Sequence, residues 1–302
     1  MKHYISYKDK TPSEVFAIFR RADQIKNLLQ EGKSLTSLSG RIIATVFFEP
    51  STRTRFSFES AVYRLGGQVI TSENGKVTGS TSKGESIEDT IRMLNCYADA
   101  IVMRHSDINA PSRAITVSDI PVINAGNGAG EHPTQALLDV YTVREKFGSF
   151  EGLTIGVVGD LKYGRTVHST IPLLLELGVA KVYAIAPEEL QFGREIREYS
   201  RVETMESWDE ILPKLDVLYM TRIQEERFTS KERYKKFNGK YILTPSEISL
   251  MKKESIVLHP LPRVNEISPE VDQDPRAWYF RQAQNGLYVR MALLEDLFRE
   301  IK

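Results

Sequence analysis

Short apolar runs rich in β-branched residues alternate along the chain with longer amphipathic stretches. The apolar runs read RIIATVFFE, QVITS, AIVMRH, VINAG, TIGVVGD, KVYAIAP, VLYMTR and IVLHPL. Most are separated by amphipathic stretches, such as FSFESAVYRLGG, SIEDTIRMLNCYA and TVHSTIPLLLELG, with the spacing of surface helices. Such alternation of strand and helix predicts βαβ units, so the fold class is α/β with parallel sheets flanked by helices.

The 302 residues correspond to about two domains at the usual ~150 residues per domain. A glycine-rich loop, NAGNGAGEHPTQ, separates an apolar run from a helix that Pro133 could begin. We therefore expect two doubly wound domains, the first over residues 1–133 and the second over 134–284. Residues 285–302 read as an amphipathic helix, which we expect to return to the first domain.

Composition excludes several function classes. Lys+Arg and Asp+Glu both number 40, so the chain lacks the overall positive charge typical of nucleic-acid or anionic-membrane binders. The longest apolar run, residues 42–48, is far shorter than the ~20 residues that span a bilayer. The N-terminus lacks the apolar core of a signal peptide, and a single cysteine, Cys96, cannot form an intramolecular disulfide. These features predict a cytoplasmic protein with Cys96 in its core.

The most specific motif is the run Ser51-Thr52-Arg53-Thr54-Arg55, directly after the strand that ends FFEP. Three hydroxyls and two guanidinium groups would meet the unpaired N–H groups of a helix N-terminus there, which suits a bound phosphate. The simpler interpretation is a helix capped by Ser51 with both arginines facing water. Five consecutive residues able to bind phosphate favour the anion site.

This run resembles the carbamoyl-phosphate signature of the transcarbamoylase family, and further motifs of the family match in order along nearly the whole chain. They are SKGES, MRH, HPTQ, GDLKYGRTVHS, TRIQEERF, HPLPR and VRMALL. The pattern is more similar to the aspartate-using branch than to the ornithine-using branch, which has HCLP where this chain has HPLP and carries an SMG loop that we do not find. The resemblance implies carbamoylation of L-aspartate by direct attack of its amine, an early step of de novo pyrimidine biosynthesis, without a metal or a cofactor.

The resemblance also assigns residues to carbamoyl phosphate. Thr54, Arg104 and His132 would donate to the carbamoyl oxygen, where negative charge grows as the amine adds. His132 can do this as a neutral donor, although a lone histidine before a helix is usually structural. The residues implied to contact carbamoyl phosphate are Ser51, Thr52, Arg53, Thr54, Ser80, Arg104, His132, Gln135, Leu261 and Pro262.

Both substrates are anions that repel each other, so a site that holds them needs concentrated positive charge. Arginine supplies forked donors that match carboxylates and phosphates. The residues implied to contact aspartate are Lys83, Arg165, Arg222, Gln224, Pro260 and Leu261. His168 and His259 also fall within matched motifs, and we interpret them as structural or supporting residues.

The polar segment Gly79–Glu85 would reach the active site of a neighbouring subunit if it acts as in the family, bringing a serine and Lys83. This implies a catalytic homotrimer. The family serine lies four residues before the lysine, where this chain has Gly79, so Ser80 and Ser82 both remain open. The simpler interpretation is a capping box, Ser82 with Glu85, at the start of the next helix, with Lys83 in solvent.

The sequence offers two other classes of function, a nucleotide-binding site and a noncatalytic homologue. Asp160, Lys162 and the glycines at 126–130 would suit a nucleotide site, but neither a GxGxxG nor a Walker motif is present. A noncatalytic homologue would lack several catalytic positions, whereas only the Ser80 region is irregular here. The sequence leaves open whether separate regulatory chains join the assembly.

Overall fold

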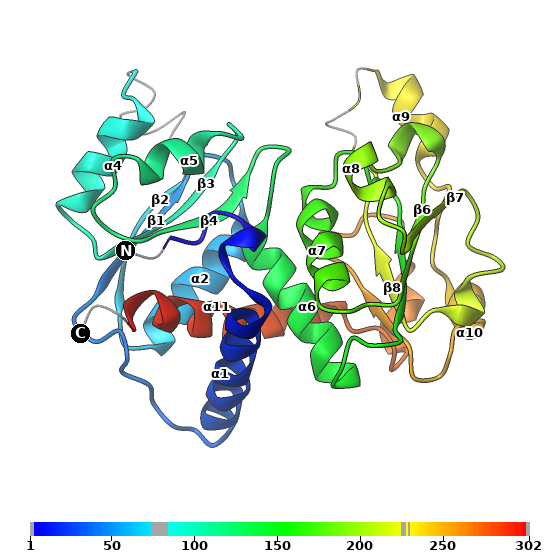
Figure 1. Cartoon of the computed structure of the whole chain (residues 1–302), viewed down its shortest axis with the longest axis horizontal. Coiled ribbons are helices and arrows are strands. Elements are labelled where there is room, and N and C mark those ends of the chain that lie inside the picture. Colours follow the sequence, from blue (N-terminus) through cyan, green and yellow to red (C-terminus); the bar gives the residue numbers. More distant parts are fainter. Residues whose placement is uncertain (1–2, 74–83, 225–227, 229, 300–302) are drawn as a thin grey trace. The chain divides into compact units, whose positions relative to one another are not determined.

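The computed structural model describes residues 3–73, 84–224, 228 and 230–299, in which strands and helices alternate (Figure 1). The chain divides into two compact units, residues 1–138 with 284–302 (unit 1) and residues 139–283 (unit 2). The helices are α1 (Pro12–Gln30), α2 (Thr52–Arg64), α4 (Ile87–Asn95), α5 (Ala110–Ile115), α6 (Pro133–Phe147), α7 (Arg165–Glu176), α8 (Arg194–Arg197), α9 (Lys231–Phe237), α10 (Pro245–Ser249) and α11 (Tyr279–Phe298).

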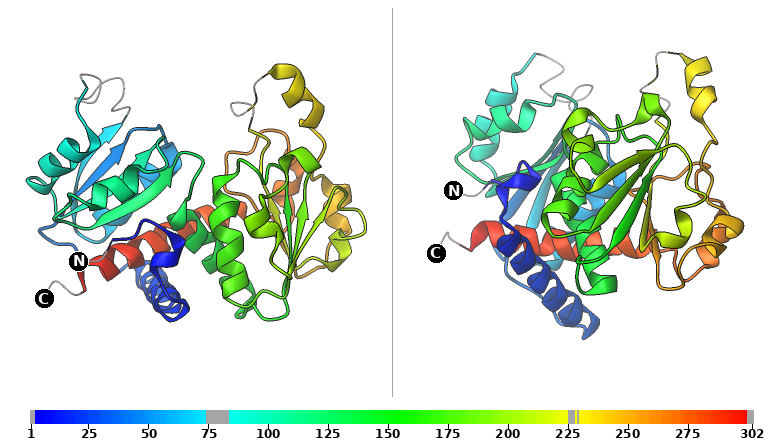
Figure 2. Two further views of the ribbon diagram at one scale, coloured as in Figure 1. Left: turned by 45° about the horizontal axis from the view of Figure 1, so that its top comes forward. Right: turned by 45° about the vertical axis from the view of Figure 1, so that its right-hand side comes forward.

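The strands of unit 1 are β1 (Ile42–Phe47), β2 (Gln68–Glu73), β3 (Ala100–His105) and β4 (Val122–Asn127). They pair in the order β2-β1-β3-β4, and every pairing is parallel. Apolar residues of α4 and α5 pack against one face of this sheet. Helix α2 lies on the other face (Figure 2). The Arg290 guanidinium of α11 stacks there on the Phe58 ring of α2, 5.1 Å from its centroid. Helices therefore cover both faces, as a parallel sheet requires.

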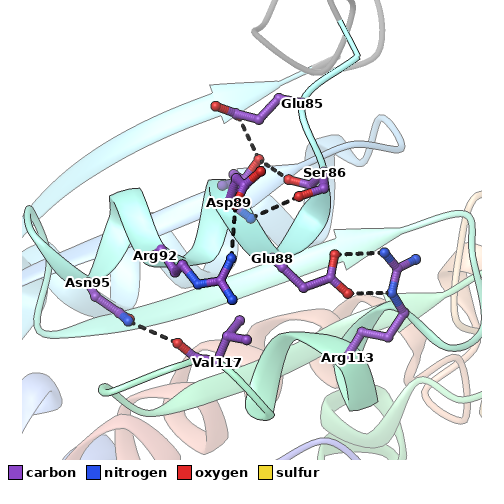
Figure 3. A network of polar contacts seen from close by, with 9 residues as sticks. Glu85, Ser86, Glu88, Asp89, Arg92, Asn95, Arg113 and Val117 are labelled. Carbon is purple, nitrogen blue, oxygen red and sulfur yellow. Dashed lines mark hydrogen bonds and ion pairs between the residues drawn. The ribbon is translucent and has the colours of Figure 1, made fainter.

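Helix α4 is held by polar contacts at its start and along its surface (Figure 3). Ser86 caps it by accepting a hydrogen bond from the Asp89 N–H at 3.1 Å. The Arg113 guanidinium of α5 donates to both carboxylate oxygens of Glu88 at 2.7 Å. The capping box of Ser82 with Glu85 was therefore a wrong interpretation, because the helix begins at Ile87 and its cap is Ser86.

The prediction that Cys96 lies in the core was also wrong, since this residue is exposed. The buried face of α4 is formed by Ile87, Ile91 and Leu94, which recur at helical spacing. Cys96 follows Leu94 by two positions, a step that turns it away from the sheet.

The strands of unit 2 are β5 (Thr154–Val158), β6 (Lys181–Ile185), β7 (Val202–Met205), β8 (Val217–Met220) and β9 (Ile256–Leu258), in the parallel order β7-β6-β5-β8-β9. Inside this unit, the fully buried Asp139 carboxylate accepts hydrogen bonds from Thr170 Oγ1 at 3.0 Å, Tyr219 Oη at 2.7 Å and Gln282 Nε2 at 2.6 Å. These bonds compensate for burying the charge and tie α6, α7 and α11 to β8.

The predicted α/β class is confirmed, with two parallel sheets and a C-terminal segment that belongs to unit 1. Pro133 begins α6, as predicted. The observed division falls after Leu138, within α6, compared with the expected boundary at residue 133. Among the described residues, no helix is both long and apolar enough to cross a bilayer.

Candidate active site

The phosphate motif of unit 1 lies where the order of the strands reverses. The chain moves outward from β1 to β2 and then returns to the other side of β1 to form β3. Open α/β sheets bind ligands at such a switch point, beyond the carboxyl ends of the two central strands. Here β1 leads into Ser51, and Arg104 of β3 pairs in register with Phe47 of β1. The fold thus brings the motif and Arg104 to one sheet edge.

The motif itself opens helix α2. Ser51 occupies the N-cap position, but among the described residues its side chain makes no capping hydrogen bond. Thr54 is buried and Arg53 is exposed, whereas the Arg55 guanidinium pairs with Glu73 at 3.0 Å. The simpler interpretation therefore holds for the N-cap position of Ser51 and for the exposed Arg53, but not for a capping bond from the Ser51 side chain or for Arg55. Arg55 has a structural contact, and Ser51 and Arg53 remain candidates to bind an anion.

Arg104 and His132 gather around Gly126. A Cβ atom added to Gly126 would lie 3.2 Å from Arg104 Nη1 and 3.5 Å from His132 Cδ2. Gly126 has a φ of +117°, a conformation that side chains with a Cβ rarely adopt. Arg104 is 8% exposed, and its Nε has no hydrogen-bond partner within the described part of the chain. Gln135, on the first turn of α6, is also buried. This is a compact cluster of donors at a sheet edge.

Glu49 is a residue of this cluster that sequence reasoning missed. Its Oε1 lies 3.2 Å from Arg104 Nη2 and forms an ion pair with it. The only sequence signal was its place two residues before Ser51, where an acidic group would face the expected anion. An incoming phosphate would have to compete with this carboxylate for Arg104.

His132 is held neutral. Burial and the neighbouring Arg290 guanidinium lower the pKa of His132 to about 3. A neutral imidazole has one N–H donor and one acceptor nitrogen. His132 can therefore donate to a ligand oxygen across the neutral pH range without carrying a charge.

In unit 2 the predicted aspartate residues follow adjacent strands at the second switch point, between β5 and β8. Arg165 is the first residue of α7, after β5, and Arg222 and Gln224 follow β8. The two strand ends are joined because Thr221 donates from both its N–H and its Oγ1 to the Val158 carbonyl at 2.8 Å. Both arginines are partly exposed at this edge.

Strand β9 lies beside β8 and leads into His259-Pro260-Leu261-Pro262 at the same edge. His259 is buried, and its Nδ1 accepts a hydrogen bond from the Leu261 N–H at 2.7 Å. Its Nε2 lies 2.7 Å from Glu266 Oε1. Leu261 has a φ of +56°, which is rare for a leucine and marks a backbone held by its surroundings. His259 therefore supports this loop.

The remaining predicted residues have separate placements. His168 Nε2 lies 2.8 Å from the Leu161 carbonyl oxygen, a contact within the loop and helix that follow β5. Ser80, Ser82 and Lys83 lie outside the described residues. In each unit, the structure brings the described candidates to the carboxyl edge of that unit's own sheet.

Family models of known proteins match both units of the chain. Residues 2–145 match the family model "Aspartate/ornithine carbamoyltransferase, carbamoyl-P binding domain". Residues 151–297 match "Aspartate/ornithine carbamoyltransferase, Asp/Orn binding domain". The chain is similar to the aspartate carbamoyltransferase catalytic subunit of Clostridium acetobutylicum, with 48% identity over 96% of this chain and 95% of that protein.

Two further similar proteins are a much longer multifunctional protein and one with a solved crystal structure. The multifunctional protein pyr1-3 of Dictyostelium discoideum is 48% identical over 98% of this chain, which spans only 13% of that protein. A crystal structure of aspartate transcarbamoylase from Trypanosoma cruzi, in complex with aspartate and phosphate, superposes with a TM-score of 0.92. It is 40% identical, covering 97% of this chain and 96% of that chain.

Replacing Gly126 with alanine should weaken anion binding at the unit 1 edge. The added methyl group would press on the Arg104 guanidinium and would strain the backbone at a φ of +117°, so we expect the Kd for inorganic phosphate, measured by calorimetry, to rise about tenfold or more. Gly32→Ala is the matched control, because Gly32 has a φ of +71° but no atoms within 4 Å of an added Cβ. Unchanged phosphate affinity in folded Gly126→Ala would contradict this arrangement.

The low pKa of His132 predicts a pH dependence of stability. The unfolded chain binds a proton at His132 below about pH 6.5, whereas the folded chain does so only near pH 3. The free energy of unfolding should therefore fall as the pH decreases between these values, and fall less in His132→Gln. Histidine NMR with this variant for assignment provides the direct measurement. A His132 resonance that titrates near pH 6.5 in the native protein would be the contrary result.

Proposed function

The chain belongs to the aspartate/ornithine carbamoyltransferase family, and from this premise we propose that it transfers the carbamoyl group of carbamoyl phosphate to the amino group of L-aspartate. The products are N-carbamoyl-L-aspartate and phosphate, and the reaction is an early step of de novo pyrimidine biosynthesis. The observation that carries the proposal is that each unit has arginines at the topological switch point of its own sheet.

Unit 1 binds carbamoyl phosphate. Ser51, Thr52, Arg53 and Thr54 hold the phosphate at the start of α2, where the helix dipole also favours an anion, and Arg104 joins them. Thr54, Arg104 and His132 donate to the carbamoyl oxygen, and Gln135 contacts the carbamoyl amino group. The support for this assignment is the cluster of Arg104 and His132 around Gly126, together with a His132 that is a donor without being a cation.

Unit 2 binds aspartate. Arg165, Arg222 and Gln224 contact its carboxylates, and the backbone of Pro260 and Leu261 lines the pocket near its amine. Pro262 adjoins the carbamoyl group. Two arginines suit a dicarboxylate but would repel the side-chain ammonium of ornithine, so charge favours aspartate as the second substrate.

The reaction is direct acyl transfer. The aspartate amine attacks the carbamoyl carbon, negative charge develops on the carbonyl oxygen, and the C–O bond to phosphate breaks as the tetrahedral intermediate collapses. The leaving phosphate takes the bonding electron pair and accepts the proton that the amine loses. Because phosphate is already a good leaving group, positioning and charge stabilisation account for most of the catalysis.

The proposed assembly is a homotrimer in which Lys83, with Ser80 or Ser82, enters the site of a neighbouring subunit. A cytoplasmic location stays a prediction from the sequence. The relatives include both a catalytic subunit and a much longer multifunctional protein, so association with regulatory chains or other enzymes is a separate question for this chain.

Substrate choice is the first test of this proposal. The purified chain should carbamoylate aspartate with a kcat/KM at least about a thousandfold above that for ornithine, because the ornithine ammonium would be buried beside arginines. Arg222→Ala should raise the KM for aspartate about tenfold or more while leaving the Kd for inorganic phosphate unchanged, since phosphate binds unit 1.

Arg197→Ala is the control for this substitution, because Arg197 belongs to unit 2 and makes a surface ion pair with Glu188 at 3.0 Å. It should keep the wild-type kinetic constants. A preference for ornithine, or an Arg222→Ala variant with an unchanged KM for aspartate, would refute the assignment of unit 2.

Complementation between inactive variants tests the shared site. Arg53→Ala and Lys83→Ala should each lose nearly all activity, since each removes a cation from every site. If subunits share sites in a trimer, every mixed trimer regains one intact site, and an equal mixture should recover about a quarter of the wild-type activity. A mixture no more active than its parents, with mixed trimers verified by mass, would show that the site is not shared.

A further inference from the structure

The segment Tyr4–Asp9 adds to the free edge of the unit 1 sheet. β4 is the last strand in the sheet order, and Tyr4 forms a parallel bridge with Ile123. The Tyr4 N–H donates to the Val122 carbonyl at 2.8 Å, and the Asn124 N–H donates to the Tyr4 carbonyl at 2.9 Å. The segment thus covers β4, the strand that carries Gly126 near its end.

The same segment contacts the residues on both sides of His132. Ser6 Oγ donates to the Glu131 carboxylate at 2.9 Å, and the Tyr7 N–H donates to Glu131 Oε2 at 3.1 Å. The buried Tyr4 hydroxyl donates to the Pro133 carbonyl at 3.3 Å. Tyr4, Ser6 and Tyr7, which lie far from His132 in the sequence, therefore contact the residues on both sides of this candidate catalytic histidine.

A second set of contacts runs from the segment to Gly126. Asn124, which is fully buried, donates from Nδ2 to the Ile5 carbonyl at 3.0 Å and accepts at Oδ1 from the Gly126 N–H at 2.8 Å. Asn127 Oδ1 accepts from the Glu131 N–H at 2.8 Å and from Asn124 Nδ2 at 3.2 Å. The end of β4 that carries Gly126 and the loop residue His132 before α6 are thereby joined through two buried amides.

The carboxylate of Glu131 is placed there at an energetic cost. Burial raises the pKa of Glu131, although the hydrogen bonds from Tyr7 and Ser6 act in the opposite direction. Asp9 accepts from the Ile5 and Ser6 N–H groups at 2.6 and 2.8 Å, which presets the conformation of the segment. Glu131 is partly buried and bonded to a segment whose conformation is already fixed. This indicates that its carboxylate holds the loop before α6 in place and is not simply a solvated charge.

We propose that the segment Tyr4–Tyr7 and Glu131 are positioning elements of the carbamoyl-transfer site, which hold His132 and the Gly126 end of β4 in the geometry that the carbamoyl oxygen requires. The inference rests on the proposed function. Glu131 itself contacts neither substrate; it acts through the backbone of the residue that follows it. Its expected effect falls on kcat, because small displacements of an oxyanion donor cost transition-state stabilisation.

The test compares three variants of the full chain. Glu131→Ala should lower kcat about tenfold or more with a smaller change in the KM for aspartate. Glu131→Gln should recover most of this loss, because an amide oxygen can accept from Tyr7 while its NH2 group donates to Ser6 Oγ. Lys10→Met is the control: it breaks the buried ion pair of Lys10 with Asp296 at 2.7 Å, which also anchors the N-terminal region but does not touch the His132 loop. It should lower Tm while kcat stays within about twofold.

The NMR resonance of His132 gives a readout that does not depend on turnover. It should shift in Glu131→Ala and return toward the wild-type position in Glu131→Gln. An unchanged kcat and resonance in Glu131→Ala would overturn the proposal, as would an equal loss of kcat in Lys10→Met, which would indicate a general loss of structure. Lack of aspartate carbamoylation by the wild-type chain would instead refute the proposed function, and the resonance would still report on positioning.

Discussion

The parallel pairing of the two strands at the switch point of each sheet is the constraint on which the site depends. Because β1 pairs with β3 and β5 with β8 in parallel register, loops distant in sequence leave each sheet at one edge. Cationic side chains can then be concentrated in a chain whose formal net charge is zero. The positive field is local, confined to two sheet edges, so the rest of the surface needs no excess of lysine and arginine.

This concentration has an electrostatic cost, which the neighbouring groups reduce. Arg104 is nearly buried, and a buried guanidinium is tolerated only with partners. Glu49 supplies a counter-charge, and the Ala125 carbonyl accepts from Arg104 Nη1 at 3.4 Å. The charge of Arg104 is therefore balanced by a partner within unit 1. A ligand must bind Arg104 more strongly than Glu49 does, which favours a dianionic phosphate over singly charged anions.

The strands and the positions of the motifs could be predicted from the sequence, because they depend on local sequence pattern. Eight of the strands correspond to its apolar runs, and its motifs lie at strand ends as expected. It missed β7, Val202–Met205, because this edge strand is largely exposed and shows no apolar run. Neither Glu49 nor Glu131 could be found, since each acts through a partner far away in the sequence, Arg104 for one and Ser6 for the other. Contacts of this kind leave no trace in periodicity or local spacing.

Two buried histidines show why residue type alone did not decide the roles. His259 accepts the Leu261 N–H at Nδ1, so the proton of its neutral form lies on Nε2, directed at the Glu266 carboxylate. Both nitrogens are thus committed to the loop, and the side chain can only support it. His132 is instead kept neutral by its burial and, in addition, by the neighbouring Arg290 guanidinium, because both lower its pKa. It therefore keeps a neutral donor at the sheet edge where carbamoyl oxygen would sit. The surroundings therefore separate the two histidines: both ring nitrogens of His259 are bonded within its own loop, whereas His132 is buried beside a cation and stays neutral.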